Sequence, residues 1–118
     1  MAVWYDKLYT GAQAAAMYKR IHKSIENEKY IKNVYLITIA EGDKDQLDVF
    51  DSVQLYMPAL RRRLQPIVGI AYGRDEAISL VQAILKDVYK NTGNLYARKF
   101  FESEMKLDDA AHQLNERS

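Results

Sequence analysis

The fold of this chain is decided by Gln65–Lys90, QPIVGIAYGRDEAISLVQAILKDVYK. Ile67–Tyr72 is a short apolar run bounded by proline and glycine, which predicts a strand covered on both faces. After the turn Gly73–Glu76, apolar residues recur at three- and four-residue steps over Ala77–Lys90 and predict a helix with one apolar stripe. Acidic residues in its first turn and lysines in its last turn suit the two ends of a helix. This strand–helix unit is the centre of the predicted fold.

The chain before this unit predicts one helix and a hairpin. Thr10–Gln13 matches a capping box, and the apolar spacing that follows predicts a helix that ends near Asn27–Lys29. Val34–Ala40 predicts a second strand with two covered faces. Leu47–Asp51 is half polar, as edge strands are, and we expect it to pair antiparallel with Val34–Ala40.

Two stretches leave alternatives open. The aromatic residues of Val3–Tyr9 form either an extra strand or a lid over the core. Val53–Met57 either continues a strand or forms a helical turn, and Pro58 suits the first turn of a short helix that runs to Leu64. Residues 106–118 are polar but keep a helical spacing of apolar residues, so we expect a short C-terminal helix that can fray.

Together these segments predict a single α+β domain over residues 1–105, followed by the polar tail. The element order is α-β-β-β-α. We expect a two-layer sandwich in which two main helices cover a small mixed sheet of three to four strands. If the sheet has only three strands, a second chain is needed to cover an edge or a face.

Composition narrows the class of protein. The chain has 118 residues, a formal net charge of +1 and no cysteine. The absence of cysteine excludes disulfides, Cys-ligated zinc and thiol catalysis, and is compatible with a reducing compartment. The N-terminal residues lack the pattern of a signal peptide, and no apolar run is long enough to span a membrane. We therefore expect a cytoplasmic protein without a membrane partner.

Five segments also resemble a group of small bacterial proteins with no assigned function. They are, in chain order, Leu8-Tyr9-Thr10-Gly11, Val34–Ala40, Gln46–Ser52, Val68–Leu85 and Asn91–Phe101. The resemblance covers the chain from about Leu8 to Phe101. It implies one intact domain, and it brings no active-site residue, cofactor or ligand with it.

No catalytic, metal-binding or cofactor-binding residue is predicted. His22 and His112 lie in no zinc-binding spacing, so we expect them on the surface or in packing. The acidic string Asp43, Asp45, Asp48 and Asp51 lacks the order of an EF-hand, so we interpret it as a solvated turn and edge strand. An enzyme is therefore the less favoured class.

Two sets of residues are candidates for binding. A contact surface is predicted from the excess of tyrosine, because tyrosine buries a ring and keeps a polar tip; its candidates are Trp4, Tyr5, Tyr9, Tyr56 and Tyr96. An anion or nucleic-acid site is predicted from the densest positive charge and the glycine turn; its candidates are Arg61, Arg62, Arg63 and Arg74.

These candidates lead to three functional hypotheses. The first is a non-enzymatic protein–protein interaction or regulatory module that forms a homo-oligomer through a sheet edge or an aromatic face. The second is a nucleic-acid accessory protein that uses Arg61–Arg63. The third is a small-ligand-binding protein with a pocket at Tyr72–Glu76.

Overall fold

The computed structural model describes residues 2–42 and 46–105. The elements in chain order are β1 (Trp4–Thr10), α1 (Ala12–Ala16), α2 (Tyr18–Glu26), β2 (Val34–Ile39), β3 (Leu47–Asp51), the 3-10 helix η1 (Ser52–Tyr56), α3 (Pro58–Arg62), β4 (Ile67–Tyr72) and α4 (Arg74–Thr92). A further helical segment covers residues 97–105. The C-terminal helix that the sequence predicts in residues 106–118 lies outside the described residues.

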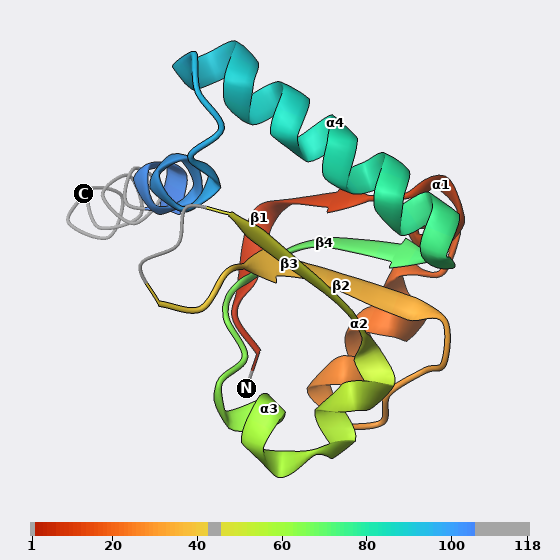
Figure 1. Ribbon diagram of the computed structural model, residues 1–118. Coiled ribbons are helices and arrows are strands. Elements are labelled where there is room, and N and C mark those ends of the chain that lie inside the picture. Colours follow the sequence, from red (N-terminus) through yellow and green to blue (C-terminus); the bar gives the residue numbers. More distant parts are fainter. Residues whose placement is uncertain (1, 43–45, 106–118) are drawn as a thin grey trace, which may run out of the picture.

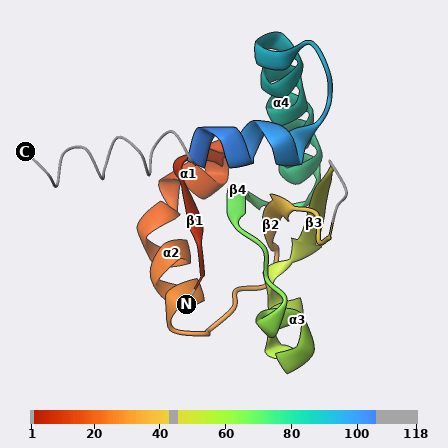
Figure 2. The ribbon, with the colours of Figure 1, turned by 90° about the vertical axis from the view of Figure 1, so that its left-hand side faces the viewer.

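The sheet has four strands in the order β1-β4-β2-β3. β1 runs parallel to β4, whereas β4 pairs antiparallel with β2 and β2 pairs antiparallel with β3. Figure 2 shows the four strands side by side, with β1 and β3 at the two edges. The predicted α+β class and small mixed sheet are confirmed, and the aromatic N-terminal stretch is a strand rather than a lid.

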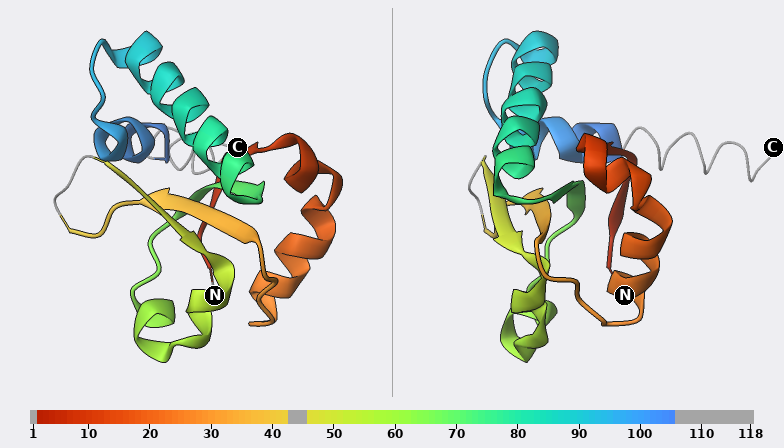
Figure 3. Two further views of the ribbon diagram at one scale, coloured as in Figure 1. Left: turned by 45° about the vertical axis from the view of Figure 1, so that its right-hand side comes forward. Right: turned by 90° about the vertical axis from the view of Figure 1, so that its right-hand side faces the viewer.

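Helices cover both faces of the sheet, and the helix order and two-layer arrangement that we expected are not confirmed. One core cluster joins the sheet to α1, α2 and the η1–α3 segment, and it includes Ile21, Leu36, Leu55 and Ile70. The other joins the opposite face to α4 and to residues 97–105 (Figures 1 and 3). The reason is that both alternating sets of side chains on β2 and β4 are mainly apolar and must be buried.

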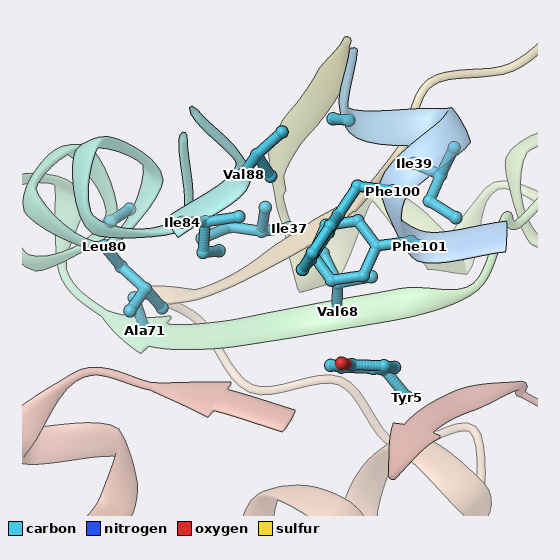
Figure 4. Packing of buried hydrophobic residues seen from close by; sticks show 12 residues of the cluster. Tyr5, Ile37, Ile39, Val68, Ala71, Leu80, Ile84, Val88, Phe100 and Phe101 are labelled. Carbon is cyan, nitrogen blue, oxygen red and sulfur yellow. The ribbon is translucent and has the colours of Figure 1, made fainter. Parts of the chain in front are cut away.

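Packing between β4 and α4 follows the sequence closely. The buried residues of α4 are Ala77, Leu80, Ile84 and Val88, as its apolar stripe predicts. Figure 4 shows Ile84 beside Ile37 of β2, with Phe100 and Phe101 closing the same cluster. Gly69 allows this close approach, because a Cβ there would lie 3.3 Å from side-chain atoms of Ile37, Leu80 and Ile84.

The start of the first helix differs from the prediction. Thr10 belongs to β1, where it pairs with Ile70, and the N-cap is Gly11 without a side-chain hydrogen bond. The capping box is therefore wrong, because the sheet holds Thr10 in a strand. The single predicted helix is also divided at Met17 into α1 and α2.

The hairpin and the segment that follows it agree with the sequence. β2 and β3 pair antiparallel from Tyr35–Asp51 to Ile39–Leu47. The Asp51 carboxylate accepts a hydrogen bond from Val53 N at 3.0 Å and caps η1, so this stretch is helical rather than a continued strand. Pro58 then begins α3, as predicted.

Candidate functional sites

The turn Tyr72–Glu76 joins three elements through one side chain. The Glu76 carboxylate accepts hydrogen bonds from Gln13 N at 2.6 Å, Ala14 N at 3.3 Å and Tyr72 N at 2.5 Å. Gln13 and Ala14 lie in the first turn of α1, whose N–H groups have no partner within the helix. Glu76 therefore supplies from α4 the cap that α1 lacks in its own sequence.

This geometry gives the turn a structural role. A Cβ at Gly11 would overlap the Glu76 Cγ and Cδ atoms, so glycine is needed for the carboxylate to reach α1. Gly73 has a φ of +87°, which favours glycine, and its N–H donates to Asn33 O at 2.7 Å. The anion position at the start of α1 is thus filled by the protein's own carboxylate. The ligand pocket that the sequence suggested at this turn stays a prediction without support from this geometry.

The N-terminal aromatic candidates pack within the monomer. Tyr5 is 5% exposed and meets the Phe101 ring edge to face at 5.0 Å. Trp4 stacks on His22 at 4.4 Å, and its Nε1 donates to Glu26 at 2.6 Å. These contacts attach β1 to α2 and to the helical segment 97–105; Tyr5 is buried by them, whereas Trp4 stays half-buried.

Tyr9 is also tied to a neighbouring element. Its hydroxyl donates to the Asp87 carboxylate of α4 at 2.9 Å. Burial raises the pKa of Tyr9 well above its ordinary value, and the hydrogen bond to Asp87 adds to the increase. Tyr9 therefore remains a neutral donor that links β1 to α4.

Tyr56 and Tyr96 are the exposed members of the tyrosine set, at 57% and 50%. The Tyr56 hydroxyl accepts from Tyr30 N at 3.2 Å, and the two rings meet edge to face. The Lys99 ammonium lies 4.9 Å from the centre of the Tyr96 ring. The two tyrosines lie in different parts of the fold, at the end of η1 and just before residues 97–105, so the structure does not join the set into one surface.

The arginine candidates are also dispersed. Arg61 is 3.8 Å from the Glu28 carboxylate, and Arg63 Nε donates to Ala59 O at 3.3 Å within the same short segment. Arg62 is exposed. Arg74 begins α4, whereas Arg61–Arg63 belong to the end of α3 on the opposite side of the sheet (Figure 1). The structure therefore does not gather the four arginines at one site.

The histidine and aspartate residues form no metal centre in the described part of the chain. No group of three or more His, Asp or Glu side chains within residues 2–42 and 46–105 is placed to hold a metal ion. His22 is a packing residue between the Trp4 and Tyr18 rings. Asp43, Asp45 and His112 lie outside the described residues. Over the described ranges, no helix has both the length and the apolarity needed to cross a bilayer.

A surface that the sequence analysis missed lies between α4 and β3. Ile78, Val81, Leu85 and Tyr89 recur at steps of three and four residues and form one flank of α4. Asp87, which reaches Tyr9 in β1, lies on the other flank, so this stripe faces the β3 side. Ile78 and Tyr89 are 48% and 60% exposed. The apolar residues of α4 extend over more of its circumference than the sheet buries. This wide apolar face could have been recognised in the sequence.

The edge strand β3 continues this surface. Val49 is 43% exposed and pairs with Ile37, whose side chain belongs to the core cluster under α4. Val49 and the stripe therefore lie on the same side of the sheet. We call Val49, Ile78, Val81, Leu85 and Tyr89 the α4–β3 surface. Figure 2 shows α4 above the middle of the sheet, with β3 at its margin.

Comparison of the chain with protein-family models, with curated proteins and with solved structures finds no match. Its function is therefore inferred from its own geometry. The resemblance to small bacterial proteins stays a prediction from sequence.

Proposed function

We propose that this chain is a non-enzymatic protein–protein contact module of the cytoplasm that associates with a second copy of itself through the α4–β3 surface. The observation that carries the proposal is a strand at the edge of the sheet whose exposed Val49 lies on the same side of the sheet as a half-exposed apolar flank of α4. Either feature alone is ordinary in a monomer, but together they provide backbone hydrogen bonds and apolar burial at one place. The cysteine-free composition suits a reducing compartment.

The backbone of β3 supports pairing with another strand. Ala40 N donates to Gln46 O at 2.9 Å, which sets the alternation of the β2–β3 ladder. In an antiparallel pair, every second residue directs both backbone groups to its partner strand, and the others direct theirs away. Asp48 and Phe50 therefore bond to β2, whereas Leu47, Val49 and Asp51 direct their N–H and C=O groups outward.

The sequence of β3 supports a second copy as the partner. Antiparallel self-pairing centred on Val49 places Val49 opposite Val49 of the second copy. In the same register, Asp48 faces Phe50 and Asp51 faces Leu47, so no carboxylate lies directly opposite another. Like charges directly opposite would destabilise the pair. Apolar residues of the α4 flank would then be covered beside the joined edges, which favours association.

The proposal is tested by measuring molar mass by light scattering across a range of protein concentrations, at low and high salt. We expect a concentration-dependent dimer. Val49→Lys places a charge at the centre of the pairing and should weaken dimerisation by at least about tenfold, which corresponds to about 1.4 kcal/mol. Ile78→Lys on the helix flank should weaken it in the same direction.

Val3→Lys is the matched control, because Val3 is also exposed, at 58%, but lies next to β1 at the far edge of the sheet. It should leave the dimer unchanged. A monomer at every concentration would refute the proposal. So would a dimer whose dissociation constant is the same in Val49→Lys and in the parent protein.

A further inference from the structure

A small cavity lies on the face of the sheet opposite α4. It has a volume of about 230 Å³ and is bounded by β2, β3 and the α3 segment. Phe50, Leu60 and Leu64 give it apolar walls, and all three pack against the core cluster on that face. Sites for drug-sized ligands usually span roughly 300–1,000 Å³, so this volume suits a molecule of few non-hydrogen atoms.

Thr38 of β2 lines this cavity with a hydroxyl that has no partner. The residue is only 2% exposed. Within residues 2–42 and 46–105, its hydroxyl makes no hydrogen bond. No side-chain polar atom of these residues is both fully buried and without a partner, so the Thr38 hydroxyl keeps contact with the open space of the cavity. A hydroxyl so placed is a ready hydrogen-bonding group for a molecule in the cavity.

Charges of both signs surround this hydroxyl. Asp48 pairs directly with Thr38 across the β2–β3 ladder and also lines the cavity. Glu41 supplies a second carboxylate, and Arg63 supplies a guanidinium from the other side, where α3 ends. Carboxylates favour an ammonium group and a guanidinium favours a carboxylate, so the two kinds of charge together fit a small zwitterion.

We propose that this cavity binds a free α-amino acid. Its ammonium group is held by Asp48 and Glu41, its carboxylate by Arg63, and one of its polar groups by the Thr38 hydroxyl. The apolar walls formed by Phe50 and Leu60 accept a small side chain. The apolar walls of this cavity and the α4 stripe lie on opposite faces of the sheet, and Val49 of β3 borders both the cavity and the α4–β3 surface.

The test is a titration of the full-length, nitrogen-15-labelled protein, observed through its backbone amide resonances. The probes are L-alanine, L-serine and L-leucine. Ethylamine and propionate are the one-charge controls, because they are alanine without its carboxylate and without its ammonium group. We expect saturable shifts at the amides of Thr38 and Asp48 with at least one amino acid, and weaker binding of both controls.

Three variants identify the contacts. Asp48→Asn and Arg63→Gln should each weaken binding by about tenfold or more, the effect of losing a hydrogen bond to a charged group. Thr38→Val keeps the side-chain shape and removes the hydroxyl, so the protein should fold normally and bind more weakly. Arg62→Gln is the matched control: Arg62 is exposed and lies outside the residues that line this cavity.

The proposal is overturned if none of the three amino acids produces a saturable shift. It is also overturned if ethylamine or propionate binds as tightly as L-alanine, since a single charge would then be sufficient. Equal affinity in Asp48→Asn, Arg63→Gln and the parent protein would place the ligand elsewhere and would likewise reject this site.

Discussion

Replacement of Glu76 by alanine should remove the hydrogen bonds that link α4 to α1 and to β4, and so destabilise the protein. The carboxylate bonds Gln13 N and Ala14 N at the start of α1 and Tyr72 N at the end of β4, while its own backbone lies in the first turn of α4. No other side-chain cap is present at the start of α1. The stability of this corner of the fold therefore depends on one side chain that comes from a distant part of the sequence.

The loss of stability depends on whether water can reach the backbone N–H groups that now bond to Glu76. The Gln13 bond is exposed, so water can replace the carboxylate there, whereas the bonds from Ala14 and Tyr72 are partly buried. Each hydrogen bond to a charged group contributes about 1.5–3 kcal/mol, so the loss of two gives about 3–6 kcal/mol. That is a large share of the roughly 5–15 kcal/mol by which small domains are stable. Glu76→Gln can keep its amide oxygen on Ala14 and Tyr72, and should recover about half of the loss.

The assay is urea unfolding followed by circular dichroism, with the free energy of unfolding extrapolated to water. Asp75→Asn is the matched control, because it removes an acidic charge from the same first turn of α4 and Asp75 makes no hydrogen bond or ion pair in the described part of the chain. We expect it to change stability only through the helix dipole, by about 0.3–1 kcal/mol.

A double-mutant cycle with Gly11 makes the test specific. Gly11 has a φ of −68°, which alanine adopts readily, so any cost of Gly11→Ala comes from overlap with Glu76. Gly11→Ala should be destabilising by about 1–3 kcal/mol in the parent protein and nearly neutral in Glu76→Ala. The reasoning is refuted if Glu76→Ala is no worse than Asp75→Asn, or if the effects of the two substitutions simply add.

Two further predictions concern the contacts of β4 and β1 with α4. Gly69→Ala should be destabilising by about 1–3 kcal/mol in urea unfolding, because its Cβ would lie 3.3 Å from side-chain atoms of Leu80 and Ile84; an unchanged midpoint would contradict this. Tyr9→Phe should reduce the loss of stability at alkaline pH. Burial and the hydrogen bond to Asp87 raise the pKa of Tyr9 in the folded state. Above about pH 10, Tyr9 therefore loses its hydroxyl proton in the unfolded chain but keeps it in the folded protein. The free energy of unfolding then falls by up to about 1.4 kcal/mol per pH unit. An identical alkaline decline in both proteins would show that Tyr9 does not contribute.

Local sequence patterns predicted the elements whose buried face can be identified from the apolar residues of one segment alone. Ile67–Tyr72 and the apolar stripe of α4 could be identified because a run or a period of apolar residues defines its own covered face. The β2–β3 hairpin followed from two adjacent strands and a short connection. The capping box failed because a local match at Thr10 competes with pairing in the sheet, and the pairing prevails.

The candidate sites were less predictable, because each depends on residues brought together from separate segments. The tyrosine excess identified rings that suit burial and exposure equally well; in the structure Tyr5 is buried, and Trp4 is half-buried against His22. Thr38 looked like one polar residue in a strand, and only the position of α3 beneath β2 and β3 makes its hydroxyl part of a cavity. Which apolar residues of α4 stay exposed depends on how much of the helix the sheet covers, and only the tertiary structure gives this.

By itself the sequence determined the α+β class, the strands β2, β3 and β4, the long helix α4 and the absence of cysteine chemistry. The physical reason is that hydrophobic period, turn residues and composition act over a few neighbouring positions. Tertiary structure alone decided that β1 pairs parallel with β4, that helices cover both faces of the sheet, and that Glu76 caps α1. These features depend on which distant surfaces meet, and that choice is made by the packing of the whole chain.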